Sequence, residues 1–463
     1  MSEQLVWRSA VEQAAMVAGR QISARELVEA QLERIAAVNP RINAIVTLVP
    51  DRALAEAGEL DRRLAAGEQP GPLHGLPVAV KDLVDTAGIR TTQGSPLFAD
   101  HVPVQDDLLV TRLRGAGAVI VGKTNTPEFG AGSHTFNPVF GLTRNPWDAS
   151  RTAGGSSGGA AAAVAAGMLP VADGSDMGGS LRNPAAFCNV CGLRPSPGRW
   201  PAWPRLDPFD ALSVQGPIAR SVADLRLLLD AVSAPDGRSP LRPPPAAASG
   251  GLRVGFSPDL GGLPIDADVA AVIATAPDML VAAGCSVEPV EVDLAGADEA
   301  FEVLRAVSFA AELAQVVADH PDRVKRTVIE NVQRGLALTG GEVASALAAR
   351  GRVFARWCEL MERYDAIAAP VTQVAPFPVE VEWPLEVGGR RMGSYIEWMR
   401  ACTRISVTAH PALSLPCGFT AAGLPVGLQL VGRLGGEHAL LDLAAAVEAV
   451  SPAAGRRPPE PPP

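Results

Sequence analysis

The chain has 463 residues, of which 47% are hydrophobic, and its formal net charge at pH 7 is -10. An acidic chain without a basic stripe argues against nucleic acid or an anionic membrane as a partner. We find neither a leader-like segment in residues 1–20 nor an apolar run of about 18 residues, so we expect a cytoplasmic protein without a membrane span. The length is compatible with about three domains or with one large α/β unit that carries an inserted portion.

The first 125 residues alternate between helix and strand patterns. Ser23 and Glu26 stand in capping-box spacing at the start of the second helix. An alternation of this kind predicts an α/β fold, with a sheet covered by helices. The expected elements are helices at 7–20 and 23–38, a strand at 43–49, a helix ending near 66, a strand at 76–80, a helix at 107–115 and a strand at 118–122.

The stretch 152–192 has the most unusual composition of the chain. Two glycine- and serine-rich segments, 154–159 and 174–180, flank an alanine-rich run at 160–166. Glycine at this density indicates backbone that adopts special conformations or approaches another group closely. The alanine run predicts a helix thin enough to lie deep among other elements. A flexible linker would not contain such a helix, so we interpret the stretch as a structured centre of the fold.

A Pro/Ala/Gly/Ser-rich segment at about 234–251 is the clearest internal boundary. Beyond it we expect a mostly helical excursion at about 297–363 that covers one face of the molecule. Strands after the excursion are expected to rejoin the main sheet, and the tail 451–463 is expected to be frayed and flexible. The remaining predicted elements are strands at 252–256, 285–292, 366–371, 412–416 and 426–431, and helices at 266–283 and 437–450.

Lysine is rare: only Lys81, Lys123 and Lys325 occur among the 40 lysines and arginines. A neutral amine can accept a proton, whereas the guanidinium of arginine does not deprotonate in proteins. A chain this biased toward arginine is expected to keep lysine where its chemistry is needed. Lys81 and Lys123 both end apolar strand patterns, whereas we place Lys325 in a polar helix at the surface.

Three short motifs match functional patterns in the wrong context. Residues 117–124 fit the P-loop pattern, but their centre is β-branched and predicts a strand instead of a phosphate-binding loop. Residues 154–158 fit GxSxG without the preceding strand that a nucleophile elbow requires. Cys188 and Cys191 form CxxC with no second pair or neighbouring histidine, so we interpret them as core residues and expect no metal ion. Six cysteines spread along the chain also do not form a secreted disulfide framework.

The two serine-rich segments together resemble the signature of a known enzyme family. The sequence GGSSGG at 154–159, an alanine helix and GSDMGGSLRNPAAFCNVCG at 174–192 resemble the amidase signature family. The flanking motifs GLPVAVKD (75–82), GKTNTPE (122–128) and LPVGLQLVG (424–432) agree. The resemblance is tightest over 75–225 and near 405–435. It implies one large α/β domain over 1–463, with a mixed central sheet covered by helices on both faces.

The resemblance also implies a Ser–cis-Ser–Lys triad. Ser180 matches the nucleophile, Ser156 the bridging serine that follows a cis peptide bond, and Lys81 the base. A serine hydroxyl attacks well only when a neighbour accepts its proton, and lysine can do so only if burial lowers its pKa. We expect the backbone amides around Met177, Gly178, Gly179 and Ser180 to stabilise the oxyanion. The resemblance implies no metal and no organic cofactor.

The loop at 199–203 is unusually aromatic, and further aromatic residues follow the excursion. We expect this loop to form one wall of the substrate pocket, with a plain surface loop as the equal alternative. Another wall is expected from Glu382, Trp383, Tyr395 and Trp398, although these residues could instead pack the excursion. An apolar pocket of this kind would suit aryl or alkyl amides.

The leading hypothesis for function is a stand-alone amidase acting on small aryl or alkyl amides through a serine acyl-enzyme, which could also cleave esters or carbamates (a urethanase activity). The second is the glutamine-hydrolysing component of a tRNA-dependent amidotransferase. An inactive binding protein on the same scaffold is a third, which the presence of all three triad residues disfavours. A fourth is a serine hydrolase that uses His410 or His438 as its base. The expected partner is a small-molecule substrate, and a homodimer is compatible with the sequence.

Overall fold

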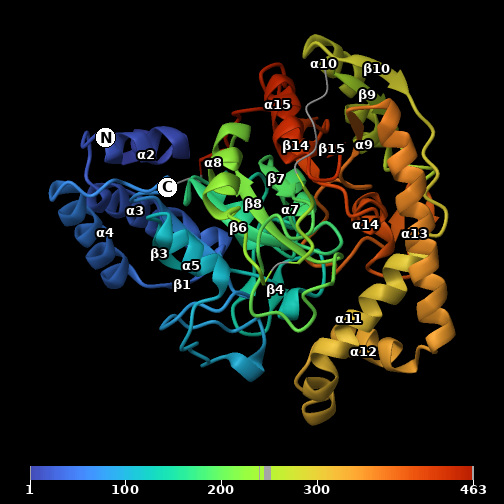
Figure 1. Ribbon diagram of the computed structural model, residues 1–463, viewed down its shortest axis with the longest axis horizontal. Coiled ribbons are helices and arrows are strands. Elements are labelled where there is room, and N and C mark those ends of the chain that lie inside the picture. The colour runs from blue at the N-terminus through green and yellow to red at the C-terminus, as the bar shows by residue number, and fades with distance from the viewer. Residues whose placement is uncertain (1, 239, 245–251, 461–463) are drawn as a thin grey trace.

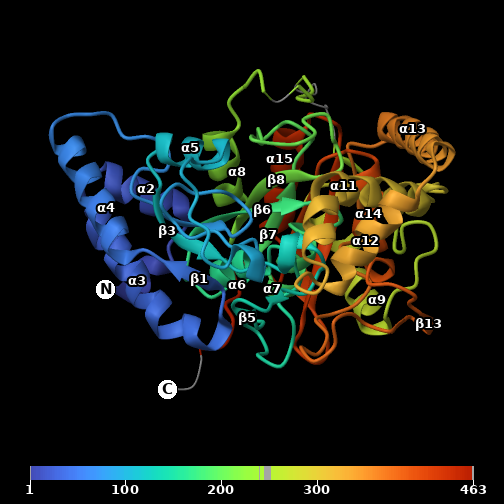
Figure 2. The same ribbon diagram turned by 90° about the horizontal axis from the view of Figure 1, so that it is seen from below.

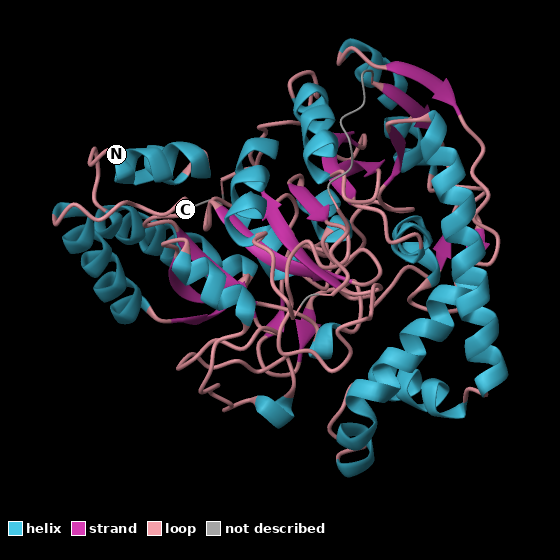
Figure 3. Cartoon of the chain, viewed as in Figure 1, coloured by secondary structure: helices cyan, strands magenta, loops and turns pink. Residues whose placement is uncertain are grey.

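The computed structural model describes residues 2–238, 240–244 and 252–460. Most strands lie in the middle of the molecule with helices around them, and a few lie at its upper right edge (Figure 3). The main sheet has eight strands in the order β10-β9-β11-β15-β14-β7-β8-β6. It is mixed, because β9 pairs in parallel with β10 and β11 whereas the remaining neighbours are antiparallel. Its strands are β6 (Val171–Asp176), β7 (Cys191–Arg194), β8 (Val214–Ala219), β9 (Arg253–Phe256), β10 (Ser286–Pro289), β11 (Ala366–Pro370), β14 (Ala412–Phe419) and β15 (Pro425–Gly432).

The N-terminal strands form a separate three-stranded sheet in the order β1-β3-β2, with β1 at Ile45–Leu48, β2 at Pro77–Lys81 and β3 at Val119–Thr124. β2 lies beside β6, but the two are joined through a side chain: the Lys81 amide donates to Asp173 Oδ1 at 3.0 Å. A carboxylate thus takes the place of the backbone carbonyl that a continuous ladder would supply. Because residues 119–124 form a buried strand, the P-loop pattern there is not a phosphate-binding loop.

Four helices form the N-terminal side of the molecule, at the left of Figure 1: α1 (Ser2–Val6), α2 (Ala10–Ala18), α3 (Ala24–Ile42) and α4 (Pro50–Ala65). The predicted helix at 7–20 starts only at Ala10, because Ser9 and Glu12 form a capping box there. The capping box predicted at Ser23 and Glu26 is present at the start of α3.

Helices cover both faces of the main sheet. Figure 2 shows α8 (Val222–Val232) and α15 (Glu437–Glu448) on one side of the strands and α6 (Gly158–Ala165) and α7 (Arg182–Cys188) on the other. Every residue of α6 and α7 is buried, as the alanine run predicts for α6. The fold class expected from the sequence is therefore confirmed. Smaller elements include α5 (Leu108–Gly115), α9 (Ala267–Ile273), α10 (Ala276–Ala282), α14 (Arg400–Val407), β4 (Phe136–Asn137), β5 (Gly141–Leu142), β12 (Glu386–Val387), β13 (Arg390–Arg391) and three short 3-10 turns at Pro96–Phe98, Glu128–Gly130 and Glu397–Met399.

The excursion consists of three helices at the right of Figure 1: α11 (Ala297–Asp319), α12 (Arg326–Ala337) and α13 (Gly340–Arg363). α11 packs against both α12 and α13 and also against α14. A second hydrophobic cluster lies between these helices and the main sheet and includes the buried residues Phe301, Trp357 and Trp398. This cluster fixes α11 beside the centre of the molecule.

Three expectations differ from the structure. The predicted helix at 266–283 is two helices, because Pro277 lies in the first turn of α10, where a missing N–H costs nothing. Lys325 is the residue before α12, not part of a surface helix, and its Nζ contacts Glu382 Oε1 at 2.6 Å. The tail packs through residue 460: Glu460 pairs with Arg34 at 3.0 Å. Positions 239 and 245–251 of the predicted linker and 461–463 of the tail lie outside the described residues.

Within the described residues, the structure contains no helix of the length and apolar character needed to cross a membrane.

Candidate active site

Lys81 ends β2 and is fully buried. Its Nζ lies 2.8 Å from Ser156 Oγ, 2.9 Å from Ser157 Oγ and 3.0 Å from Ser175 Oγ. All three hydroxyls come from the glycine- and serine-rich segments on either side of α6. The end of a strand therefore meets both segments at one amine.

Burial lowers the pKa of Lys81 to about 7, although the negative charges of Asp173 and Asp176 oppose the shift. No carboxylate of the described residues forms an ion pair with this amine, and the nearby Asp173 accepts from the Lys81 backbone instead. The hydroxyl partners are neutral and do little to favour the charged form. Near neutral pH a large share of Lys81 is therefore the free amine, which can accept a proton.

The peptide bond between Gly155 and Ser156 is cis, as the family resemblance implies. Ser156 is buried, and the amide of the next residue, Ser157, donates to the Ser180 carbonyl at 3.2 Å. This bond ties the two serine-rich segments together directly. Gly159 follows in the first turn of α6, where a Cβ would lie 2.4 Å from the Asn125 amide nitrogen. Glycine there lets the helix approach β3 closely.

The loop between β6 and α7 is organised by a buried carboxylate. Asp176 accepts from the Gly179 amide at 2.8 Å and from the Leu181 amide at 3.2 Å. Arg182 donates to both oxygens of Asp176 at 2.9 and 3.0 Å, and Arg194 pairs with the same carboxylate at 3.4 Å. Burial raises the pKa of Asp176, but the two guanidinium groups outweigh that effect and hold the pKa below its usual range. Asp176 and Arg182 thus hold the loop.

For one residue of this loop, Gly179, the structure differs from the role expected from the sequence. Gly179 was expected to direct its amide toward the oxyanion, but that N–H is bonded to Asp176. In the described structure the amides of Met177, Gly178 and Ser180 have no hydrogen-bond partner and are free to act as donors. Gly179 is needed for shape: its φ is +112°, and a Cβ would lie 2.6 Å from Cys402 Cβ.

A cavity of about 240 Å³ opens over these groups. Ser156, Ser175 and Ser180 all face it, together with Met177 from the loop. The rest of the wall consists of Leu83, Gln93, Phe129, Gly130, Ser213, Arg305, Phe309, Glu312 and Leu313. The sequence motifs indicated the three triad positions but not Ser175, Arg305 or the apolar side chains from residues 83–130.

The three predicted triad residues are only partly linked by hydrogen bonds. Lys81 is joined to Ser156, but no hydrogen bond joins the Ser156 and Ser180 hydroxyls in the described structure, although both face the cavity. His410 is buried and its Nδ1 lies 2.8 Å from the Thr408 carbonyl oxygen. His438 lies on α15 and contacts Asp230 at 3.4 Å. Neither histidine lines the cavity, which removes the geometric basis for a histidine-based hydrolase.

Lys123, the other lysine at a strand end, serves a different purpose. Its buried amine contacts the hydroxyls of Thr86 and Thr91, both at 3.0 Å, and also the Val84 carbonyl. Burial lowers its pKa to about 8. Lys123 does not line the cavity and instead anchors residues 84–91 beside it.

The aromatic segments do not line the cavity. Trp200 is buried in the main core and donates to the Leu229 carbonyl at 3.2 Å. Trp398 is also buried, and Trp383 packs against Tyr395. Tyr395 contacts the cavity residue Arg305, which donates to its hydroxyl at 2.7 Å. The expectation of aromatic pocket walls from these segments is therefore wrong, and the alternative, packing of the excursion, holds for the second set.

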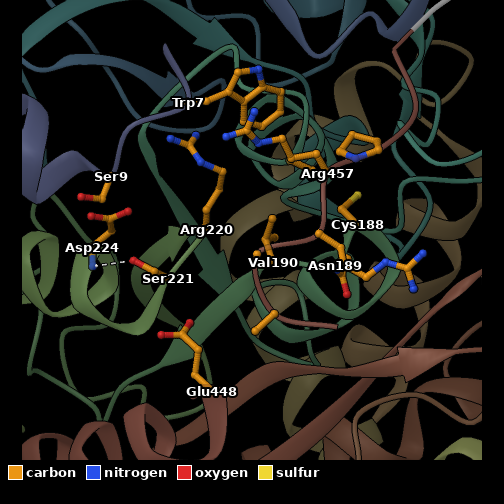
Figure 4. A pocket seen from close by; sticks show the side chains of 15 residues that line it. Trp7, Ser9, Cys188, Asn189, Val190, Arg220, Ser221, Asp224, Glu448 and Arg457 are labelled. Carbon is orange, nitrogen blue, oxygen red and sulfur yellow. Dashed lines mark hydrogen bonds between the residues drawn. The ribbon is translucent and has the colours of Figure 1, made fainter. Parts of the chain in front are cut away.

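A larger cavity of about 460 Å³ lies elsewhere, where the N-terminal residues, the start of α8 and the C-terminal tail meet (Figure 4). Trp7, Arg220 and Asp224 line it, as do Cys188 and Arg457. None of the predicted triad residues faces it. Cys188 and Cys191 are buried and burial raises the pKa of both thiols, in keeping with core residues.

The chain is similar to known proteins over nearly its whole length. A family model described as Amidase matches residues 26–441. The chain is 38% identical to an acylamidase of Rhodococcus erythropolis, over 99% of this chain and 98% of that protein. It is 36% identical to one subunit of the glutamyl-tRNA(Gln) amidotransferase of Moorella thermoacetica, over 98% of this chain and 99% of that protein. The crystal structure of a bacterial aryl acylamidase superposes with a TM-score of 0.90 at 28% identity, covering 97% of this chain and 99% of that one.

Proposed function

Because the chain belongs to the amidase signature family and is a hydrolase of amide C–N bonds other than peptide bonds, we propose that it cleaves small aryl and alkyl amides through an acyl-enzyme on Ser180. The observation that carries the proposal is the contact of 2.8 Å between the buried Lys81 amine and Ser156 Oγ. The contact matters because the Lys81 amine can be neutral, with a pKa of about 7, and because Ser156 faces the same cavity as Ser180.

The proton path runs from Ser180 through Ser156 to Lys81. A neutral amine has two N–H groups and one lone pair. Three hydroxyl neighbours therefore fill its hydrogen-bonding capacity when two of them accept from the amine and one donates to it. We assign the donating hydroxyl to Ser156, because it alone of the three combines contact with Lys81 and the bridging position in the family motif. The missing contact between Ser156 and Ser180 is expected to form with substrate, since catalytic hydrogen bonds in free enzymes are often long.

Attack by Ser180 Oγ on the amide carbon forms a tetrahedral intermediate. The unpaired amides of Met177 and Gly178 are the proposed donors to its oxyanion, each worth roughly 3–4 kcal/mol. Lys81 then returns a proton through Ser156 to the leaving nitrogen, and the C–N bond breaks. Water hydrolyses the resulting ester on Ser180 with the same groups in reverse order.

The acyl-enzyme chemistry extends to esters and carbamates, because each presents a carbonyl carbon to the same nucleophile. Hydrolysis of glutamine in an amidotransferase assembly is the second candidate, which the likeness to the Moorella thermoacetica protein favours. The sequence identity to the acylamidase is higher, 38% against 36%, so we place the stand-alone amidase first. We also propose that the enzyme is cytoplasmic, that its substrate is a small molecule, and that residues 1–463 form one domain.

The test is a panel of aliphatic amides, anilides and carbamates, with glutamine alongside, assayed on the purified chain. We expect anilides or alkyl amides to be cleaved faster than glutamine, and Ser180→Ala to abolish all turnover. Faster release of ammonia from glutamine would favour the role in an amidotransferase. Turnover that survives in Ser180→Ala or Lys81→Ala would contradict the proposed mechanism.

A further inference from the structure

One wall of the catalytic cavity comes from the excursion helix α11. Arg305, Phe309 and Glu312 all line it. Their spacings of four and three residues place them on one face of the helix. α11, yellow to orange in Figure 1, thus brings two charged residues to a cavity that otherwise has only apolar and neutral polar walls.

Arg305 is held in a fixed position. Its Nη2 and Nε donate to Tyr395 Oη at 2.7 and 3.2 Å, and the same oxygen accepts from Asn331 Nδ2 at 2.9 Å. Its Nη1 lies 3.1 Å from Met177 Sδ, and the guanidinium carbon is 4.3 Å from the centre of the Phe309 ring. The planar group is therefore oriented before any substrate arrives.

The guanidinium lacks a negative partner. Two arginines of neighbouring helices pair with acidic residues of α11: Arg404 with Asp298 at 2.7 Å and Arg334 with Glu302 at 2.9 Å. Arg305 itself pairs with no carboxylate of the described residues, although only 6% of it is exposed. A thioether is a weak acceptor, and the phenol and ring supply no charge. A buried cation of this kind is costly unless an anion accompanies it.

We propose that Arg305 forms a carboxylate subsite, so that among N-aryl and N-alkyl amides the preferred substrates carry a carboxylate within a few atoms of the scissile carbonyl. This inference rests on the proposed function. Arg305 lies near the nucleophile, because it contacts the side chain of Met177, which is three residues before Ser180 and lines the same cavity. Glu312 is exposed and lies two helical turns farther along α11. Its charge disfavours an anion at that outer position and directs a substrate carboxylate toward Arg305.

The experiment compares matched pairs of anilides that differ in charge but hardly in shape. On the acyl side, succinanilic acid is paired with 4-methylpentananilide, in which an isopropyl group replaces the carboxylate. On the amine side, 4-(butyrylamino)benzoate is paired with the 4-isopropyl anilide of butyric acid. The measured quantity is the ratio of kcat/KM for the charged and the neutral member of each pair. Ser180→Ala serves as the blank.

We expect the wild-type ratio to exceed about 10 in at least one pair, in line with a charge-assisted bidentate contact. Arg305→Gln should lower that ratio at least about tenfold, and Arg305→Lys should lower it less. Arg326→Gln, which removes a largely exposed arginine from the next helix, is the matched control and should leave the ratio as in the wild type. Thermal unfolding of each variant verifies that the protein is folded.

A wild-type ratio at or below 1 in both pairs would overturn the inference, as would a ratio that Arg305→Gln does not change. Equal losses on both members of a pair would show that Arg305 only supports the loop, and would overturn it too. These results differ from a failure of the proposed function, in which wild-type protein would cleave neither the charged nor the neutral anilides.

Discussion

Lys81 is the residue whose surroundings decide the chemistry. It has three hydroxyl neighbours and no ion-pair partner among the described residues, so burial dominates and its pKa falls to about 7. An arginine at this position would remain charged. This explains physically why a chain so poor in lysine has one here.

The pH dependence of activity follows from that pKa. Lys81 accepts a proton only when it is neutral, so kcat/KM on a neutral anilide should rise as pH increases through about 7 and level off above it. Burial raises the pKa of Asp173, which accepts from the Lys81 amide, to about 6. Asp173 therefore titrates mostly at a lower pH than Lys81. The measurement is initial rate from pH 5.5 to 9, and a profile that falls or stays flat across this range would contradict the role of Lys81.

At the scale of single elements, the loop between β6 and α7 is positioned by one buried carboxylate. Asp176 satisfies two loop amides and two guanidinium groups at once. The loop therefore holds its shape before substrate binds. The free amides of Met177, Gly178 and Ser180 depend on this arrangement.

Replacement of that carboxylate tests the arrangement. Asp176→Asn leaves Arg182 and Arg194 buried without their counter-ion, so we expect the free energy of unfolding to fall by about 3–5 kcal/mol. The unfolding midpoint in a thermal scan should drop accordingly. Asp148→Asn, in a partly exposed pair with Arg151, is the control and should change stability by less than about 1 kcal/mol. Similar small shifts for both variants would show that the buried pair does not hold the loop.

Element by element, the sequence predicted the features that local chemistry determines. The alanine run indicated α6, and Ser23 with Glu26 indicated the start of α3. The break before α10 was missed because an apolar pattern continues across Pro277. The gap between β2 and β6 was missed as well, because only the position of Asp173 in space shows that a side chain replaces the ladder.

At the scale of the whole molecule, the site joins parts of the chain that are far apart in sequence. Lys81 at the end of β2 contacts the serine-rich segments around α6, and these segments face a cavity whose other walls come from residues 83–130, Ser213 and helix α11. The serine-rich segments could be recognised from sequence because their motif is long and local. Arg305 could not be recognised, because its lack of an acidic partner depends on which side chains the excursion brings near it. The aromatic composition of the loop at 199–203 was misleading for the same reason: composition does not show which face a tryptophan occupies.

The most direct test of Ser180 as the nucleophile and Lys81 as its base is to trap and locate the acyl-enzyme. An activated acyl ester is mixed with the enzyme, the reaction is quenched at short times, and intact mass and peptide mapping locate the adduct. The proposed mechanism predicts that the acyl group is on the peptide containing Ser180, and that Lys81→Ala and Ser156→Ala each slow its formation by about 10²–10⁴-fold. An adduct on any other residue, or acylation of Lys81→Ala at the wild-type rate, would contradict it.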